Sequence, residues 1–286
     1  MLSILVLGGT RFVGLAILNE IQKLGADITI FNRGITHHKK ISQASYVVGD
    51  REFGYESLSG KHFDFVIDIS GLKRRYLEHT KTLHFNHYIF ISSVAVYNND
   101  NESGIDENGK LIESGELKNQ LVPNGYALNK LLSERYLIEV VRNLTILRPG
   151  FILGPNDYTG RFSKYCQFAN ATEPIIAPLP KNAPFQFIDV RDFARFVLHC
   201  VTDRITGTFN VVAPPTTWLN SMSTLKVILG RDLKFFEPTT VEEFPLCDFG
   251  TNYAQRNVSA QAAINLGLET RKMSETYLDF VNWLEK

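Results

Sequence analysis

Cysteine is scarce in this sequence. The three cysteines stand far apart, without a Cys-x-x-Cys pair, at Cys166, Cys200 and Cys247. Such spacing excludes a disulfide framework and a cysteine-based zinc site. The seven histidines include two close pairs, but neither pair has carboxylates or thiols at metal-ligand spacing. We therefore expect no metal centre, and free thiols in a reducing compartment, which we take to be the cytoplasm.

Net charge and long apolar runs are absent as well. Lys and Arg total 30, as do Asp and Glu, so no global field attracts nucleic acid or an anionic membrane. No apolar run approaches the length that crosses a bilayer. The chain enters an apolar stretch directly after Met1, without a basic lead or a cleavage site, so we expect no secretion signal. A small-molecule partner fits this composition better than nucleic acid or a membrane.

Glycine, in contrast, is concentrated in a turn near the N-terminus. An apolar run from Leu2 to Leu7 leads into Gly8-Gly9-Thr10-Arg11-Phe12-Val13-Gly14, and a helical pattern follows. Gly25 stands where a left-handed helix C-cap favours glycine. A second strand, Asp27 to Phe31, completes a βαβ unit. Its right-handed crossover leaves the glycine turn at the carboxyl edge of the sheet, where such sheets bind ligands.

This turn has the chemistry of a dinucleotide-binding site. Backbone N–H groups at a helix start, reinforced by the helix dipole, bind anions such as a pyrophosphate. Arg11 replaces the middle glycine of the usual fingerprint. We hypothesise that its side chain points away from the backbone groove and adds positive charge beside the cofactor phosphates; the alternative is a surface arginine on a turn that binds nothing. The residues assigned to the cofactor here are Gly8, Thr10, Arg11, Phe12, Val13 and Gly14.

The ends of the next two strands bear on which dinucleotide binds. Asn32-Arg33 stands where NAD-binding chains carry a carboxylate for the ribose hydroxyls. An arginine can instead hold a 2′-phosphate bidentately, so the sequence favours NADP, with NAD as the alternative. Asp50, after the third strand pattern, is placed to meet the adenine amino group or, equally, to cap a turn.

The remaining pattern predicts an α/β fold. Further apolar runs, separated by helical or polar stretches, lie at 46–48, 63–69, 88–92 and 144–147. Their near-continuous apolar character predicts a doubly wound parallel sheet, a Rossmann fold, covered by helices on both faces. We expect residues 1–154 to form the dinucleotide-binding domain and 155–286 mainly a smaller substrate-binding lobe, with about 185–213 partly returning to the Rossmann domain.

Two of these strands end in small polar residues at the cofactor edge. Ser70-Gly71 would let the nicotinamide half of a dinucleotide pass close to the backbone, and Ser93 would place a hydroxyl beside the reactive ring. The alternative is that each serine only begins a turn. A long acidic stretch, 98–125, follows, and a loop of this length is typical of an active-site wall or lid.

Tyr126 and Lys130 lie four residues apart at the start of a helical pattern, so both side chains share one face. A free tyrosine has a pKa of about 10 and is a poor acid or base at neutral pH. We expect the Lys130 ammonium, with a cationic nicotinamide ring, to lower the pKa of Tyr126 towards 7, which requires about 4 kcal/mol. Tyr126 then becomes a usable general acid/base.

These motifs together resemble the extended or atypical short-chain dehydrogenase/reductases, the group that includes the NAD-dependent epimerase/dehydratases. The resemblance covers nearly the whole chain and rests on the glycine turn, Ser93 with Val96-Tyr97, Tyr126-x3-Lys130, Leu147-Arg148-Pro149-Gly150 with Gly154-Pro155, and 187–192. It implies Ser93, Tyr126 and Lys130 as the catalytic set: tyrosine exchanges a proton with the substrate oxygen, lysine holds the nicotinamide ribose, and serine orients the substrate.

The resemblance implies an NAD(P)-dependent oxidoreductase that transfers hydride at a hydroxyl or carbonyl carbon, with a nucleotide-sugar epimerase or dehydratase as the alternative. The glycine-turn variant and Phe31-Asn32-Arg33-Gly34 also resemble a subgroup that contains chloroplast stem-loop RNA-binding proteins. A dinucleotide-sensing, RNA-associated protein without turnover is therefore a further alternative. The family resemblance is also compatible with a homodimer.

The part of the chain after Pro155 is less regular and is assigned to the substrate. Its polar, aromatic segment 156–162 follows the Leu-Arg-Pro motif. We place Asp157 and Arg161 beside Ser93 as candidate substrate-binding residues. Arg161 would meet a substrate phosphate, as nucleotide-sugar enzymes require, or else lie on an ordinary solvated surface.

Overall fold

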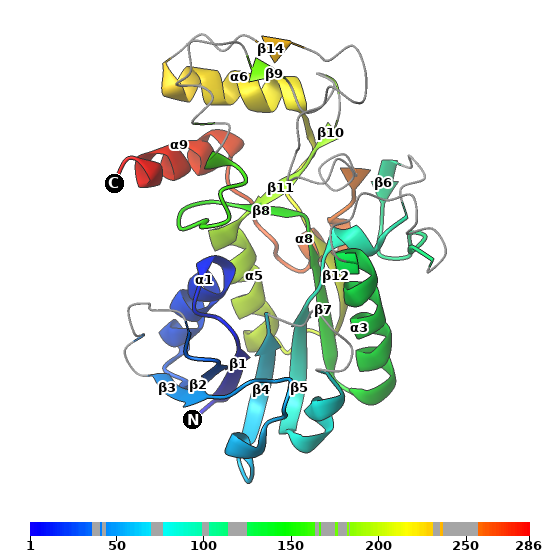
Figure 1. The fold of residues 1–286 in the computed structure, drawn as a ribbon. Coiled ribbons are helices and arrows are strands. Elements are labelled where there is room, and N and C mark those ends of the chain that lie inside the picture. Colours follow the sequence, from blue (N-terminus) through cyan, green and yellow to red (C-terminus); the bar gives the residue numbers. More distant parts are fainter. Residues whose placement is uncertain are drawn as a thin grey trace.

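A computed structural model describes residues 1–35, 41, 44–69, 77–98, 103–113, 125–163, 166, 175–176, 182, 184–230, 235–236 and 257–286. Its centre is a seven-stranded sheet with the order β12-β7-β5-β4-β1-β2-β3, in which every neighbouring pair is parallel (Figure 1). The strands are β1 (Ser3–Leu7), β2 (Asp27–Asn32), β3 (Ala44–Val48), β4 (His62–Asp68), β5 (His84–Ile91), β7 (Leu144–Pro149) and β12 (Gly207–Val211).

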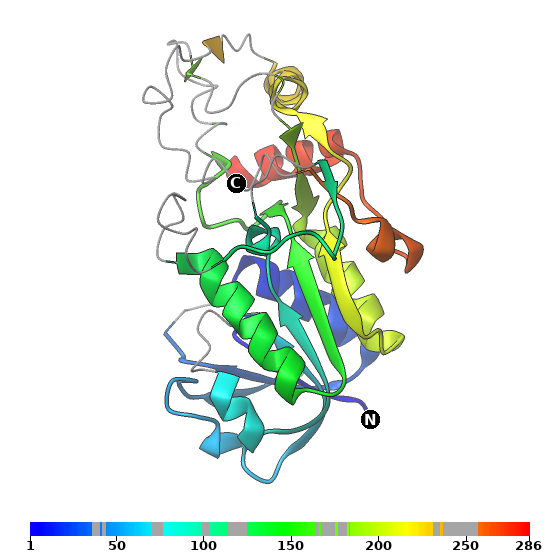
Figure 2. The ribbon, with the colours of Figure 1, turned by 90° about the vertical axis from the view of Figure 1, so that its right-hand side faces the viewer.

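Helices cover both faces of this sheet. On one face, α1 (Phe12–Ile21) packs against α5 (Val190–Thr202), and on the other lies α3 (Tyr126–Val140) (Figures 1 and 2). Alternate residues along each strand serve the two faces. In β4, for example, Phe65 joins the core with α1 and α5, whereas Val66 joins the core with the end of α3. Strands buried on both sides need apolar residues at nearly every position, and this explains the near-continuous apolar runs.

The first βαβ unit forms as its sequence predicts. Helix α1 passes into a short 3₁₀ turn, η1 (Gln22–Leu24), and Gly25 closes it with φ 62°, the left-handed conformation that favours glycine. The other 3₁₀ turns among the described residues are η2 (Glu56–Leu58), η3 (His79–Thr82) and η4 (Val94–Val96). The predicted fold class, a doubly wound parallel sheet of Rossmann type, is confirmed.

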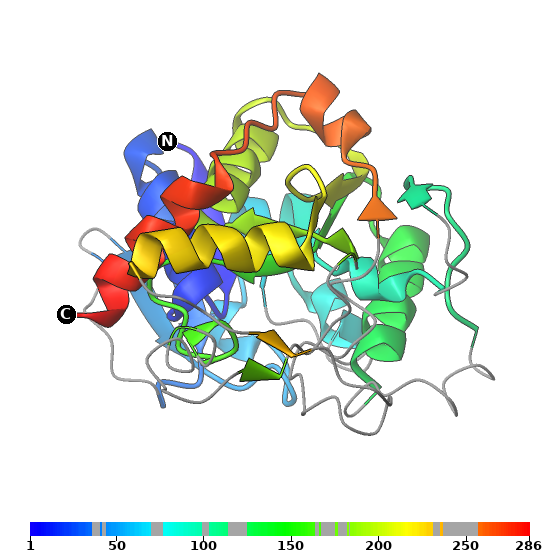
Figure 3. The same ribbon diagram turned by 90° about the horizontal axis from the view of Figure 1, so that it is seen from above.

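Short strands and helices lie beyond the seven-stranded sheet. Of these, β6 (Ser103–Ile105), β15 (Asn257–Val258) and α8 (Gln261–Asn265) pack on the core of the main sheet, where α8 contacts β12. The strands β9 (Ile175–Ile176) and β14 (Phe235–Phe236) pair with each other. A second packing unit above the carboxyl edge of the sheet is formed by β8 (Phe151–Leu153), β10 (Pro184–Phe185), β11 (Phe187–Asp189), β13 (Thr216–Thr217), α6 (Trp218–Leu229) and α9 (Met273–Leu284), and Figure 3 shows α6 beside α9. Aromatic side chains, among them Phe162, Trp218 and Tyr277, fill their own core here.

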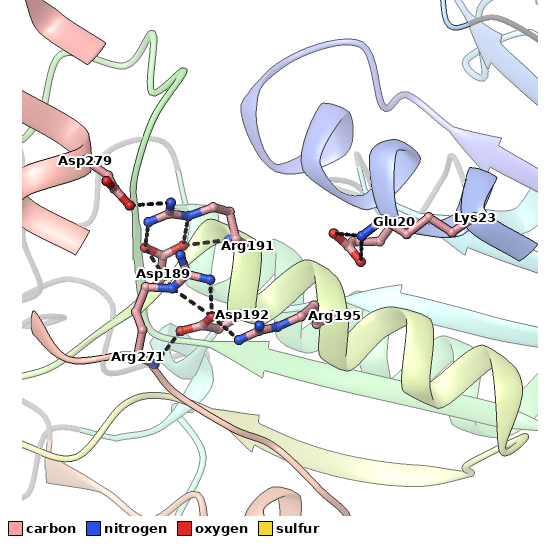
Figure 4. Close-up of polar contacts among 8 residues, drawn as sticks. All are labelled: Glu20, Lys23, Asp189, Arg191, Asp192, Arg195, Arg271 and Asp279. Carbon is pink, nitrogen blue, oxygen red and sulfur yellow. Dashed lines mark hydrogen bonds and ion pairs between the residues drawn. The ribbon is translucent and has the colours of Figure 1, made fainter. Parts of the chain in front are cut away.

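An ion-pair cluster joins α5 to the C-terminal segment (Figure 4). Asp189 caps α5 by accepting a hydrogen bond from the Arg191 backbone N–H, and its carboxylate also pairs with the Arg191 guanidinium. Arg191 in turn contacts Asp279 of α9 at 2.5 Å. Arg271 donates to the buried carboxylate of Asp192 at 2.7 Å. The cluster therefore holds α9, which belongs to the upper unit, against a helix of the main sheet.

The structure bears on four further expectations: the domain division, the loop at 98–125, the cysteines and membrane-spanning segments. Residues 207–211 return to the main sheet as β12, while the division at 154 into two functional domains stays a prediction. The stretch 98–125, expected as a loop, contains the short strand β6. Cys166 and Cys200 are free and buried, and Cys247 lies outside the described residues. Within the described ranges, no helix is long and apolar enough to cross a membrane.

Candidate active site

The glycine turn between β1 and α1 forms a tight cradle. Gly8 and Gly9 both have positive φ, 94° and 89°, which the turn requires. A Cβ added to Gly14 would lie 2.2 Å from Gly9 Cα, so the helix packs against the turn more closely than a side chain allows. The amides of Gly14 and Leu15 bond to the Arg11 carbonyl, so the N–H groups before them stand at the positive end of α1. This backbone fits a pyrophosphate.

Arg11 sends its side chain out of the cradle. Its guanidinium carbon lies 4.9 Å from the ring centroid of Tyr158, in the loop after β8, and both side chains are exposed. This cation–π contact joins the glycine turn to the segment assigned to the substrate. The placement agrees with the hypothesis that Arg11 points away from the backbone groove. Its contact with cofactor phosphates stays a prediction.

The end of β2 offers an unsatisfied donor. Asn32 Oδ1 accepts a hydrogen bond from the Gly34 N–H at 2.8 Å, while Asn32 Nδ2 is buried and has no hydrogen-bond partner among the residues that the structure describes. A buried N–H without an acceptor is costly, so this group fits a ligand oxygen such as a ribose hydroxyl. Arg33 is exposed beside it, as a 2′-phosphate contact would need.

The structure supports a cofactor role less for the other predicted cofactor residues, Asp50, Ser70 and Gly71. Asp50 Oδ1 accepts from the Glu52 N–H at 3.0 Å, so Asp50 forms the turn that was the alternative interpretation, and an adenine contact stays a prediction. Ser70 and Gly71 lie outside the described residues.

The three predicted catalytic side chains come together at the carboxyl edge of β5. Tyr126 is the first residue of α3, and its hydroxyl is hydrogen-bonded to that of Ser93, the residue that caps η4. Lys130, one turn along α3, is 3% exposed and donates to the Ile91 carbonyl at 2.6 Å. Its Nζ lies 5.9 Å from the centroid of the Tyr126 ring. The structure thus places the three groups around one point, while their catalytic roles stay a prediction.

The electrostatics of this trio differ from the sequence-based expectation. Burial raises the pKa of Tyr126 above its ordinary value, although the Ser93 hydrogen bond and the Arg161 charge act in the opposite direction. Burial lowers the pKa of Lys130 to about 8. In the protein alone, the pKa of Tyr126 thus lies above its ordinary value, while the expected lowering by Lys130 together with a bound nicotinamide ring stays a prediction. The ammonium is directed at the Ile91 carbonyl, and loss of water around the phenol is the larger effect.

Two residues that the sequence reasoning missed hold this helix in register with the strand end. Glu134, one turn beyond Lys130, accepts a hydrogen bond from the Ser92 hydroxyl. Its carboxylate also pairs with Arg148 of β7, whose Nη2 lies 2.6 Å from Glu134 Oε2, and both side chains are buried. Consecutive residues of the strand end, Ile91 to Ser93, therefore each contact a side chain of α3. The four-residue spacing from Lys130 to Glu134 was the available signal.

The polar network continues from Arg148 to Ser259, which lies between β15 and α8. Arg148 Nη1 donates to the Tyr97 hydroxyl at 2.8 Å, and Tyr97 donates to Asn210 Oδ1 of β12 at 2.7 Å. Asn210 Nδ2 then donates to the Ser259 carbonyl at 3.0 Å. A buried polar network with its members satisfied fixes one arrangement of the groups that it joins.

The segment after β8 brings charge towards the trio. Asp157 is buried and accepts from the backbone N–H and hydroxyl of Thr159 at 2.9 and 2.6 Å, so it shapes the turn that carries Tyr158. Phe162 anchors the segment in the upper core, and Arg161 just before it acts electrostatically on Tyr126. Direct substrate contacts of Asp157 and Arg161 stay predictions.

The sequence model of the NAD dependent epimerase/dehydratase family matches residues 64–211, just over half of the chain. The chain belongs to this family. The predicted family resemblance is thereby confirmed. The match to the family model begins within β4 and does not include the glycine turn at 8–14. The interpretation of that turn as a dinucleotide site therefore depends on its own geometry.

One curated protein is similar to this chain in sequence. The chloroplast stem-loop binding protein of 41 kDa b of Arabidopsis thaliana is 28% identical over 221 residues, covering 69% of this chain and 54% of that protein. The chain thus spans about half the length of that curated relative.

Two solved structures show the shared fold. The UDP-glucose-4-epimerase of Stenotrophomonas maltophila, solved with NAD and formylated UDP-arabinopyranose, has a TM-score of 0.76 at 17% identity and covers 100% of this chain and 98% of its own. The Bordetella bronchiseptica enzyme WbmH, in complex with NAD+, has a TM-score of 0.79 at 13% identity and covers 100% and 99%.

Proposed function

We propose that this protein is an NADP-preferring oxidoreductase of the epimerase/dehydratase type, in which Ser93, Tyr126 and Lys130 form the catalytic set. The observation that carries the proposal is the hydrogen bond between the Ser93 and Tyr126 hydroxyls, with a buried ammonium one helical turn away. This arrangement stands at the carboxyl edge of a parallel sheet, where the glycine cradle also lies.

The residues present fit a nicotinamide dinucleotide. The backbone of the glycine cradle would hold the pyrophosphate, and the unpaired Nδ2 of Asn32 would donate to an adenosine oxygen. The family is NAD-dependent, and solved relatives of its fold contain NAD. Arg33 is what supports NADP for this chain, because an exposed guanidinium suits a 2′-phosphate and the position lacks a carboxylate that would repel it.

Side chains of the protein transfer the proton to or from the substrate oxygen. When bound, the nicotinamide supplies or accepts the hydride. Tyr126 gives a proton to the substrate oxygen or takes one from it, and Ser93 holds that oxygen through a hydrogen bond. The raised pKa keeps the Tyr126 phenol protonated at neutral pH, which is the form that protonates a carbonyl oxygen during reduction. Lys130 is the group that would hold the nicotinamide ribose.

The proposed substrate is a small molecule with a hydroxyl or carbonyl carbon, bound between the glycine turn and the upper unit. Residues 155–286 supply most of this lobe. Nucleotide sugars are one candidate class, because structures of the same fold were solved with formylated UDP-arabinopyranose and with UDP-glucose. Arg161 supplies positive charge near the Tyr126 hydroxyl that such an anionic substrate would need.

The test is a fluorescence titration of the protein with NADPH and with NADH. We expect tighter NADPH binding, and Arg33→Ala should weaken NADPH binding selectively because it removes the 2′-phosphate contact. Arg135→Ala, which removes an exposed arginine in the middle of α3, is the matched control and should change neither affinity. Tyr126→Phe should bind NADPH normally but lose turnover of carbonyl substrates.

The same titration decides the alternative class of function. If neither dinucleotide binds at physiological concentration, the oxidoreductase proposal fails. The similarity to the stem-loop binding protein then makes RNA affinity the next measurement, with its salt dependence as the readout.

A further inference from the structure

A second ion pair is buried in the same layer as Lys130, between the sheet and α3. Arg51, in the turn after β3, donates to both oxygens of Asp68, the last residue of β4, at 2.9 and 2.8 Å. The Tyr88 hydroxyl of β5 donates to Asp68 Oδ2 at 2.8 Å, and the Asp68 carboxylate is fully buried. Three charge-assisted hydrogen bonds therefore converge on one carboxylate in a dry environment.

The register of the sheet places Asp68 next to the lysine. Asp68 pairs with Phe90 across the β4–β5 ladder, and Lys130 Nζ lies 4.8 Å from the centroid of the Phe90 ring. Nζ also donates to the carbonyl of Ile91, the next residue along β5. The ammonium thus occupies the end of the strand adjacent to Asp68, and the two groups interact electrostatically.

The charges around Lys130 act in two directions. Burial lowers the pKa of Lys130 to about 8, Asp68 opposes this lowering, Arg51 adds to it, and Glu134 opposes it. Burial alone would raise the pKa of Asp68, but Arg51 outweighs it and holds the pKa below the ordinary value. Asp68 is therefore ionised at neutral pH, and it stands between two cations that would otherwise repel each other.

We propose that Asp68 is a positioning residue for Lys130: it holds the buried ammonium charged at the end of β5, while Arg51 fixes the Asp68 carboxylate in its place. Asp68 touches neither substrate nor cofactor in this role and acts only through the lysine. The inference concerns the lysine of the proposed catalytic set and rests on the proposed function for its consequence in catalysis. The pairing itself stands on the contacts of the protein alone.

The proposal predicts that Lys130 responds to the Asp68 charge. Asp68→Asn removes the attractive charge and leaves Arg51, so Lys130 should lose its proton at a pH lower by about one unit. Arg51→Gln alone would also free the buried Asp68 carboxylate to take up a proton, so Arg51 is removed only together with the Asp68 charge. A role of Asp68 limited to packing would leave the Lys130 titration unchanged in Asp68→Asn.

The measurement is an NMR titration of the full chain labelled with ¹³C and ¹⁵N lysine, between pH 6 and 10, without added nucleotide. The Lys130 signal is assigned by its loss in Lys130→Arg. Tyr88→Phe is the matched control: it removes a hydrogen bond from Asp68 but no charge, and the Lys130 titration should stay in place. In the double variant Arg51→Gln with Asp68→Asn, which removes both charges, Lys130 should lose its proton at a higher pH than in Asp68→Asn and at a slightly lower pH than in wild type.

Unchanged titration of Lys130 in Asp68→Asn, or a shift to higher pH, overturns the proposal. If Asp68→Asn fails to fold, the double variant decides it, because its Lys130 should titrate slightly below that of wild type and a higher value overturns the proposal. The result is separate from the proposed function, since no dinucleotide is present. The expected shifts in a protein that binds neither NADPH nor NADH would uphold the pairing and refute the oxidoreductase.

Discussion

Replacing Lys130 by methionine should make the folded protein more stable at neutral pH. Burial holds the pKa of Lys130 at about 8, whereas the unfolded chain has the ordinary value of 10.5. The folded state therefore binds the proton less tightly, and a charged lysine costs stability below pH 8. The difference of about 2.5 pH units, at about 1.4 kcal/mol each, gives a cost of about 3 kcal/mol at pH 7.

The sign of the pH dependence follows from linkage. Between pH 8 and 10.5 the unfolded chain still binds this proton and the folded chain has released it, so stability gained from this group rises with pH. By pH 10 about 1 kcal/mol of the cost remains. Lys130→Met also loses the hydrogen bond to Ile91, worth about 1 kcal/mol, but that loss is nearly the same at both pH values.

The assay is urea unfolding of wild type and Lys130→Met at pH 7 and pH 10. The variant's advantage in free energy of unfolding should be larger at pH 7 than at pH 10 by about 2 kcal/mol. Lys130→Gln, which is also uncharged, should show the same difference. An equal advantage at both pH values would show that Lys130 titrates normally in the folded protein, and the electrostatic reasoning about this site would be refuted.

Three further predictions concern the frame of the site. Gly14→Ala should cost about 3 kcal/mol of stability and abolish NADPH binding, because the added Cβ would meet the Gly9 backbone. Gly25→Ala, with open space around its Cβ, should cost only about 1 kcal/mol. Urea unfolding measures the stability of both variants, and nucleotide titration measures their NADPH binding. Glu134→Gln should cost about 3 to 5 kcal/mol by leaving Arg148 buried and unpaired, and adding Arg148→Met should recover much of it in thermal unfolding. Stability should fall as pH drops below about 4, since ion pairs hold the pKa of Asp189 below its ordinary value; Asp189→Asn should flatten that acid limb of the urea midpoint.

Local sequence signals predicted the parts of the fold that depend on local chemistry. Gly25 adopts the left-handed conformation that a helix C-cap favours, and the apolar runs became strands of the main sheet. The spacing of Tyr126 and Lys130 placed both on one helix face, and the hydroxyl of Ser93 meets that face as the strand-end pattern indicated. These features depend on neighbours in sequence or on the general geometry of parallel sheets.

Features that depend on distant partners were out of reach. Arg51 and Asp68 read as ordinary charged residues of a turn and a strand end, and their pairing needs the sheet to bring positions 17 apart in sequence into contact. Arg148 belongs to a recognisable motif, but its ion pair could not be predicted, because its partner Glu134 lies on another element. The burial that raises the pKa of Tyr126 in the protein alone could not be predicted either, since the loss of water around a side chain is a property of the folded packing.

The contact between Arg11 and Tyr158 would make the affinities for the two proposed ligands interdependent. Arg11 belongs to the turn that would hold the cofactor phosphates, and Tyr158 to the segment that would meet the substrate. A ligand that draws the guanidinium off the ring therefore alters the free energy of the neighbouring segment. By reciprocity, whatever factor bound nucleotide imposes on substrate affinity, bound substrate must impose on nucleotide affinity. This one surface contact would couple the two affinities by the same factor whichever ligand binds first.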